Sequence, residues 1–304
     1  MKNGTIWQDI NGNDIQAHGG CIIEHKGTYY WYGEHKGADN CPGTRRVDVI
    51  GVSCYSSPDL VNWKYEGLVL EADKEDPNSY IHTSKVLERP KVIYNEKNDN
   101  FVLWMHIDSP DYVYAGVGIA VSKSPTGPFE LKTVTIPNRQ DSRDMTIFKD
   151  VDGNAYLVHS SNWNKTLDIA LLNEDYDDLE GFYRPVLIDQ EREAPALFFK
   201  DGTYYMVTSG CTGWDPNPAL YATCDHLLGR WKLIDNPCVG EDYKTTFFGQ
   251  STYIFEVKGR FYFMLDHWKP LDLKTSGYSI LPIEIKENGD LVIEWRDEWR
   301  GIEE

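Results

Sequence analysis

The chain of 304 residues lacks several features that define common protein classes. It has no run of 18 apolar residues, the minimum length that would indicate a transmembrane helix. Basic residues are scarce, because 30 Lys and Arg stand against 48 Asp and Glu, which gives a net charge of −18. Phosphate backbones and anionic lipids repel such a chain, so we expect neither nucleic acid nor a membrane as a partner.

Cysteine motifs and a leader segment are also missing. None of the six cysteines forms a CxxC pair, so a zinc ribbon or a thioredoxin-type motif is not supported. An even count permits disulfides, but Cys is also a common small buried residue, and Cys21 and Cys54 lie in strand-like runs, so we expect mostly free thiols. Residues 1–4 lack the apolar segment of a signal peptide. The chain is therefore expected to be cytoplasmic, or secreted with its signal peptide already removed.

Helical periodicity is absent from the whole chain. No window of about ten residues combines a 3.6-residue apolar period with helix caps, and residues 174–180 are too few and too rich in Asp. Short runs of β-branched and aromatic residues, bounded by Gly, Asn or Asp, are typical of strands. The turn residues are evenly spaced and no linker divides the chain. These patterns predict an all-β protein with a single domain that spans residues 1–304.

What the sequence does contain is a repeat. A polar residue stands eleven to thirteen positions ahead of an aromatic strand residue, with a tight turn between them. The polar residues, called the five repeat positions below, are His18, Glu88, Asp144, Glu193 and Gln250. The aromatic residues are Tyr29, Phe101, Tyr156, Tyr204 and Phe261. Units of about four antiparallel strands that recur roughly every fifty residues predict a five-bladed β-propeller. Residues 291–295 are expected to close the ring beside the N-terminal strand.

The residues at the five repeat positions also predict a site for acid–base catalysis. The first strand of each propeller blade lines the axis, so residues at its start converge on one mouth of the channel. Glu88, Asp144 and Glu193 would then share a cavity, where burial and mutual repulsion raise the pKa of at least one carboxyl group. A carboxylic acid that keeps its proton near neutral pH, opposite a second carboxylate, is what glycoside hydrolysis requires. Each of the three has an adjacent arginine that either holds a carboxylate or bridges blades.

Motifs at these positions resemble glycoside hydrolase family 43, a family of five-bladed propellers. The resemblance rests on Glu193-Ala194-Pro195, on Asp144 and on the Gly-Thr-Tyr-Tyr hairpins, and it spans nearly the whole chain. It implies that Glu193 is the general acid and that Asp144 orients it and tunes its pKa. The usual base of the family, an Asp followed by Pro in the first blade, is missing, because residues 16–20 read Gln-Ala-His-Gly-Gly.

A narrower resemblance accounts for this departure. Six segments are similar to the exo-β-1,3-galactanase branch of the family: residues 15–20, 30–34, 88–95, 142–146, 208–216 and 250–252. The branch implies that Gln250 positions or deprotonates the attacking water and that Glu88 holds sugar hydroxyls. An amide oxygen is barely basic at neutral pH, so Glu88 or His18 could instead take the proton. The alternative for His18 is a neutral axial histidine with a structural role.

Further substrate contacts are expected from residues that could face the mouth: Glu34, Tyr114, Thr212, Trp214 and His18. Trp214 suits stacking on a galactose face, or it anchors the packing of its loop. Asp168, on the third blade, is a weaker candidate for a hydroxyl contact. No metal ligand and no cofactor are predicted for catalysis, although a structural Ca²⁺ or Na⁺ near the propeller axis is compatible with the sequence.

The expected function is therefore an inverting, exo-acting glycosidase. It would release galactose from β-1,3-galactan or its oligosaccharides, and the backbone of arabinogalactan would be its polymeric partner. One alternative is an α-L-arabinofuranosidase or β-galactofuranosidase of the same family. Another is a non-catalytic glycan-binding propeller, which the missing first-blade Asp favours and which Glu193 and Asp144 argue against.

Overall fold

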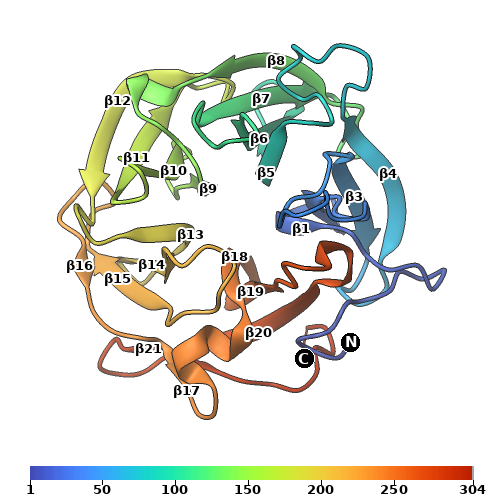
Figure 1. Ribbon diagram of the computed structural model, residues 1–304. Coiled ribbons are helices and arrows are strands. Elements are labelled where there is room, and N and C mark those ends of the chain that lie inside the picture. Colours follow the sequence, from blue (N-terminus) through green and yellow to red (C-terminus); the bar gives the residue numbers. More distant parts are fainter. Residues whose placement is uncertain (303–304) are drawn as a thin grey trace.

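The computed structural model describes residues 1–302, whose strands form five sheets arranged radially around an axis (Figure 1). Blade 1 consists of β1 (His18–His25), β2 (Thr28–Glu34), β3 (Gly51–Ser57) and β4 (Lys64–Glu71). Blade 2 consists of β5 (Val86–Asn95), β6 (Asn100–Asp108), β7 (Gly116–Ser122) and β8 (Glu130–Thr135). Blade 3 consists of β9 (Met145–Lys149), β10 (Ala155–Ser161), β11 (Thr166–Leu172) and β12 (Leu179–Val186).

The last two blades complete the ring. Blade 4 consists of β13 (Arg192–Lys200), β14 (Thr203–Gly210), β15 (Leu220–Cys224) and β16 (Lys232–Leu233). Blade 5 consists of β18 (Gln250–Val257), β19 (Arg260–His267), β20 (Gly277–Ile285), β21 (Leu291–Glu294) and β17 (Cys238–Val239). The helices of the described chain are three short 3₁₀ turns, η1 (Pro137–Arg139), η2 (Tyr243–Phe248) and η3 (Leu273–Thr275). The predicted all-β, five-bladed propeller is confirmed.

The inner strands form a closed ring. β1, β5, β9, β13 and β18 each pack against the next, and β18 packs against β1. Five clusters of buried apolar side chains fill the five interfaces between neighbouring blades. Alternation along each strand supplies both interfaces. In β2, Trp31 packs toward blade 5 and Tyr32 toward blade 2, while in β6 Leu103 packs toward blade 1 and Trp104 toward blade 3. All four side chains are fully buried.

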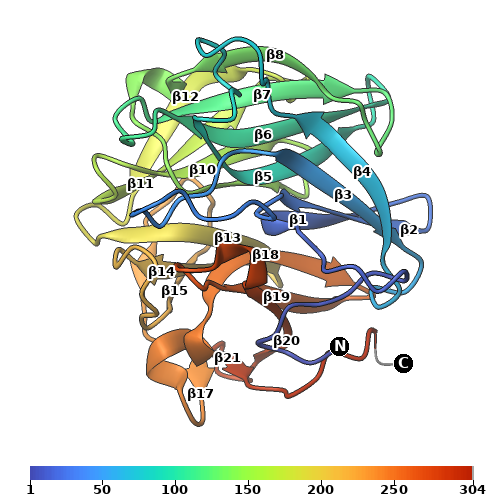
Figure 2. The ribbon, with the colours of Figure 1, turned by 45° about the vertical axis from the view of Figure 1, so that its right-hand side comes forward.

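The ring is closed differently from the prediction. β21 does not lie beside the N-terminal strand, because it pairs with β20 on one side and with β17 on the other. The N-terminal segment itself reaches blade 5, where Tyr278 N donates to Thr5 O at 3.0 Å and Trp299 N donates to Met1 O at 2.8 Å. The segment runs along the last strands of the chain (Figure 2). Backbone pairing by residues 1–5, and not by β21, therefore joins the two ends of the sequence.

The cysteines agree with the sequence-based expectation. All six cysteines are free thiols, and Cys21, Cys54, Cys224 and Cys238 are buried. Within residues 1–302 there is no helix with the length and apolar character needed to cross a membrane.

Four of the five inner strands have a β-bulge at or next to the repeat position. The register shifts lie between His18 and Cys21, Glu88 and Lys91, Glu193 and Ala196, and Ser251 and Tyr253. In three of these strands the residue after the repeat position has a left-handed φ, at Gly19 (60°), Arg89 (53°) and Ala194 (52°). Bulges redirect the neighbouring side chains and are frequent beside active sites.

At the first of these bulges, a close approach between strands requires glycine in addition to the left-handed φ. A Cβ on residue 19 would lie 2.2 Å from Glu34 Oε1, so Gly19 allows β1 to approach β2 closely. The bulges thus give the inner strands a common irregularity at the mouth of the channel, where the five repeat positions lie.

Candidate active site

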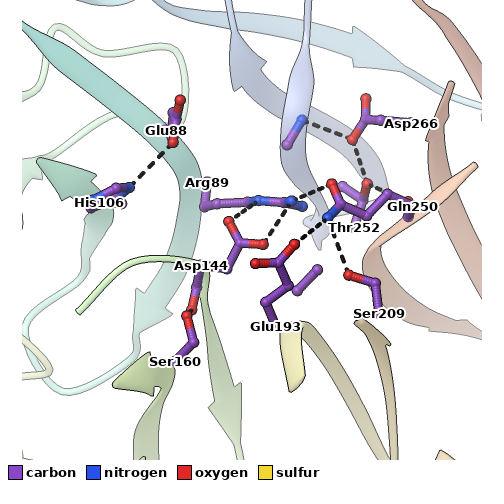
Figure 3. A network of polar contacts seen from close by, with 12 residues as sticks. Glu88, Arg89, His106, Asp144, Ser160, Glu193, Ser209, Gln250, Thr252 and Asp266 are labelled. Atoms are coloured by element: carbon purple, nitrogen blue, oxygen red, sulfur yellow. Dashed lines mark hydrogen bonds and ion pairs between the residues drawn. The ribbon is translucent and has the colours of Figure 1, made fainter. Parts of the chain in front are cut away.

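A cavity of about 210 Å³ opens at this mouth. Its lining includes four of the five repeat positions: Glu88, Asp144, Glu193 and Gln250. The side chains of Asp144, Glu193 and Gln250 gather around the guanidinium group of Arg89, and Glu88 lies to one side of them, beside His106 (Figure 3). Residues from four different blades are therefore brought together, as the repeat predicted.

Glu193 lies near the start of β13 and is almost fully buried. Its Oε1 accepts a hydrogen bond from Gln250 Nε2 at 3.2 Å, and its Oε2 accepts one from Asn164 Nδ2 at 3.2 Å. Burial and then the charge of Asp144 raise the pKa of Glu193 to about 8. The carboxyl group therefore keeps its proton at neutral pH, which is the state that a general acid needs.

Arg89 links three blades at the centre of the site. Its Nε and Nη2 donate to the two carboxylate oxygens of Asp144, at 2.8 and 2.9 Å. Nη2 also donates to Gln250 Oε1 at 2.7 Å, and Nη1 donates to Ser251 O at 3.1 Å. Burial opposes the charge, but Asp144 and other carboxylates outweigh it and raise the pKa of Arg89 further. This arginine thus fixes Asp144 of the next blade and does not pair with the adjacent Glu88.

The other two flanking arginines do not pair with the adjacent carboxylate either. Arg143 Nη1 donates to Asp141 Oδ2 at 2.5 Å, and Arg192 Nε donates to Thr208 Oγ1 at 2.9 Å. Of the two roles that the sequence left open for these arginines, Arg89 fills both, because it holds a carboxylate and bridges blades.

The amide of Gln250 has a defined orientation. Its Oε1 accepts from Arg89 Nη2 and from Trp268 Nε1, at 2.9 Å for the latter, and both groups can only donate. Its Nε2 must therefore be the atom that faces Glu193 Oε1 and Ser209 Oγ, the latter at 3.1 Å. Both lone pairs and both N–H groups are used, so in this state Gln250 holds its neighbours in place and offers no acceptor to a water.

Glu88 has the opposite protonation from Glu193. It accepts hydrogen bonds from Tyr112 Oη at 2.6 Å and from His106 Nδ1 at 3.3 Å. Burial alone would raise its pKa, but the His106 hydrogen bond and the charges of Lys36 and His106 outweigh burial and lower the pKa to about 2. Glu88 is therefore a carboxylate at neutral pH, which can accept a hydrogen bond from a sugar hydroxyl or a proton from a water.

The positive partner of Glu88 is held in turn by a second acid. His106 Nε2 lies 2.9 Å from Asp108 Oδ2. Burial lowers the pKa of His106, but the hydrogen bonds with Asp108 and Glu88 outweigh it and raise the pKa to about 9.

Two further predicted residues line the cavity, Glu34 and Trp214. Glu34 is only 3% exposed and is held by Lys36 Nζ at 2.6 Å from Oε2 and by Arg89 N at 2.9 Å from Oε1. The ring of Trp214 lies edge-on to Trp268, with 5.1 Å between the ring centroids. Both predicted positions are therefore at the site, although Glu34 braces the bulge of β5 as much as it faces the cavity.

The prediction that His18 contacts the substrate, or takes a proton from water in the cavity, does not fit the structure. His18 is fully buried and does not line the cavity. Its Nδ1 lies 3.1 Å from Asp266 Oδ1, its Nε2 lies 2.9 Å from Tyr278 Oη, and its ring stacks on that of Tyr278. Both ring nitrogens are occupied, so the alternative of an axial histidine with a structural role is the one observed.

Tyr114 and Thr212 are also outside the cavity lining. The Tyr114 ring packs on Tyr80 at 5.2 Å, and the Thr212 hydroxyl is turned into its own loop, where it donates to Asp215 O at 2.5 Å. Asp168 is buried within blade 3, where burial raises its pKa to about 6, and it does not line the cavity. Tyr114 and Thr212 were predicted from loop position and Asp168 from its blade, and neither fixes where a side chain points.

The sequence contained a signal for a set of site residues of which only Glu34 was predicted. Each repeat position has a polar partner on the second strand of its blade: Glu34, His106, Ser160, Ser209 and Asp266. These partners follow the repeated aromatic residue by four or five positions, so the same period identifies them. Tyr112, Asn164 and Trp268 come from connections between strands, where the repeat carries no information.

No metal site is evident in the part of the chain that the structure describes. Residues 1–302 contain no group of three or more His, Cys, Asp or Glu side chains that could hold a metal ion. Between β1 and β5 the buried Lys91 donates from Nζ to Gly19 O at 2.6 Å. A structural ion near the axis stays a prediction.

Comparison with known proteins assigns the family. The model of glycosyl hydrolases family 43 matches residues 20–290. The chain belongs to this family. A family 43 β-1,3-galactosidase solved with galactodeoxynojirimycin is 41% identical with a TM-score of 0.92, and the match covers 98% of this chain and 99% of that one. No curated protein sequence matched significantly.

Two longer family 43 proteins are also similar. The exo-β-1,3-galactanase from Phanerochaete chrysosporium, solved with β-1,3-galactotriose, is 33% identical with a TM-score of 0.89, over 96% of this chain and 66% of that one. The exo-β-1,3-galactanase from Clostridium thermocellum is 34% identical with a TM-score of 0.88, over 98% and 65%. This chain thus spans about two thirds of these relatives. The predicted family and its galactanase branch are confirmed, and the protein is a glycosidase.

Proposed function

We propose that this family 43 glycosidase releases galactose from the non-reducing end of β-1,3-galactan and its oligosaccharides, with inversion. The observation that carries the proposal is a small cavity that combines a protonated Glu193 with an ionised Glu88. At about 210 Å³ it is smaller than the roughly 300–1,000 Å³ of pockets for drug-sized ligands, which suits one terminal sugar. Three of the similar solved proteins are named β-1,3-galactosidase or exo-β-1,3-galactanase, and these names supply the sugar and the linkage.

Each side chain has a role in this scheme. Glu193 gives its proton to the oxygen of the departing sugar, while Asp144, held by Arg89, keeps the pKa of Glu193 raised. Gln250, which the resemblance links to the attacking water, holds Glu193 and Arg89 in position. It can orient the attacking water only after one of its Oε1 partners withdraws. We assign the proton of that water to Glu88, which is ionised at neutral pH although its lowered pKa makes it a weak base.

The test is the anomer released from β-1,3-galactobiose. We expect proton NMR to show α-galactose first, followed by slow mutarotation, because water attacks the face opposite the leaving group in an inverting enzyme. β-Galactose as the first product would contradict the water-attack scheme. Faster turnover of nitrophenyl α-L-arabinofuranoside or β-D-galactofuranoside would assign the enzyme to a furanoside substrate. Binding of galactobiose without turnover would indicate a glycan-binding protein, for which the raised pKa of Glu193 has no use.

Replacing Asp144 with Asn is expected to move the alkaline limit of activity to lower pH. Activity requires protonated Glu193, so kcat/KM of the unmodified enzyme should fall as the pH rises through about 8. After burial, the Asp144 charge is the next cause of that raised pKa, and the Arg89 charge opposes it. Without the Asp144 charge, Glu193 loses its proton at lower pH. The kcat/KM profile on galactobiose from about pH 5 to about pH 10 measures the shift, and an unmoved alkaline limit would mean that burial alone sets it.

A further inference from the structure

An exposed tryptophan lies beside the cavity on the side of the general acid. Trp163 is 65% exposed in the turn that joins β10 and β11. The next residue, Asn164, lines the cavity and donates from Nδ2 to Glu193 Oε2 at 3.2 Å. Trp163 is therefore one residue along the chain from a side chain that contacts the acid.

The turn is fixed by hydrogen bonds to Asp141 and by a cation–π contact with Arg143. Asp141 accepts backbone hydrogen bonds from Asn162 N at 2.7 Å and from Trp163 N at 2.9 Å. Arg143, which pairs with Asp141 and lines the cavity, places its Cζ 4.4 Å from the centroid of the Trp163 ring. One face of the Trp163 indole covers the Arg143 guanidinium group, and most of the remaining side-chain surface is exposed to solvent.

Folding alone does not account for this arrangement. Residues 162, 163 and 164 have φ angles of 50°, 54° and 62°, three successive left-handed residues without a glycine. Such backbone is unfavourable for residues with a Cβ and persists where the surroundings hold it, often at functional sites. This backbone leaves a large aromatic ring exposed to water, so the ring gains no stabilisation from burial. At Trp163 the turn therefore combines a left-handed backbone with an exposed indole at the rim of the site.

We propose that Trp163 is a stacking platform for the leaving group, the galactosyl units that follow the one being cleaved. This rests on the proposed function. Glu193 protonates the oxygen that joins the terminal galactose to the next unit, so the rest of the chain leaves on the side of Glu193 and Asn164. The C–H groups on one face of β-galactose form an apolar surface. A rigid aromatic ring offers such a surface a large contact at low cost in conformational entropy.

The experiment compares substrates of increasing length. For Trp163→Ala we expect kcat/KM on β-1,3-galactotriose and β-1,3-galactotetraose to fall about tenfold, mainly through KM, and the advantage of these substrates over galactobiose to disappear. The inhibition constant of free galactose should stay unchanged, because galactose occupies only the cavity. Trp163→Phe should keep most of the length dependence. Trp163→Leu serves as a second variant without an aromatic ring, in case the alanine variant does not fold.

Phe182→Ala is the matched control, because Phe182 is another exposed aromatic residue, 50% exposed on the outer strand β12. It should change none of these constants. An equal loss on every substrate together with weaker galactose inhibition would mean that Trp163 only braces Asn164 and Glu193, and would overturn the proposal. An unchanged length profile in both Trp163→Ala and Trp163→Leu would overturn it as well. Failure of the proposed function is distinguishable, since it appears in the unmodified protein as no turnover of any β-1,3-galacto-oligosaccharide.

Discussion

Replacing Glu193 with Gln is expected to lower kcat on β-1,3-galactobiose by about 10²- to 10⁴-fold, the usual contribution of a general acid. The amide has the shape of the acid but no proton to give. The fold should survive, because the introduced amide would still have partners in the site. Its N–H₂ group can face Asn164, whose Oδ1 is buried without a partner and can accept after a rotation of that amide.

The leaving group makes this prediction specific. Nitrophenyl β-galactoside departs with little need for protonation, so Glu193→Gln should lose much less activity on it than on galactobiose. Glu191→Gln is the control, since Glu191 is exposed two residues earlier and should be silent on both substrates. Thermal unfolding shows whether the folds are equal. Unchanged turnover of galactobiose by Glu193→Gln would refute the assignment of the acid.

The repeat made most of the fold and the centre of the site predictable. A period-two alternation of buried side chains and a tight turn in every unit depend only on local sequence, so the blades could be counted. The start of each inner strand then defined the five repeat positions, and four of their side chains meet at the cavity. The period also marks the cross-strand partners such as His106 and Asp266, which hold Glu88 and His18.

The other features of the site could not be predicted from the repeat, because they depend on backbone irregularities and on loops. His18 and Glu88 occupy equivalent positions in the repeat. His18, however, is buried between Asp266 and Tyr278, whereas Glu88 lines the cavity. Arg89 reaches Asp144 and Gln250 from a bulge in which its φ is left-handed, and the residue type does not predict that conformation. Trp268 follows a strand end, and the sequence does not show that its indole N–H fixes an amide 18 residues earlier.

Replacing Arg89 with Met is expected to have the second large effect, on stability as well as on activity. Removing one partner of a buried ion pair leaves the other uncompensated, which costs about 3–5 kcal/mol in the free energy of unfolding. Asp144 would lose both of its hydrogen bonds to the guanidinium, and Gln250 Oε1 would lose one of its two donors. Because Gln250 in turn holds Glu193, kcat on galactobiose should fall by about 10²-fold, as expected for a misplaced catalytic group.

A second substitution separates these two effects. In Arg89→Met with Asp144→Leu both charges of the pair are gone, so urea unfolding should show most of the lost stability restored, since replacing a whole buried pair by apolar groups is often neutral. Activity should not return, because Glu193 would have neither its neighbouring charge nor a fixed Gln250. Arg89→Lys, which cannot form the two parallel bonds to Asp144, should lie between Arg89→Met and the unmodified enzyme. Recovery of kcat in the double variant would show that Arg89 serves only to neutralise Asp144, and that the positions of Gln250 and Glu193 do not depend on it.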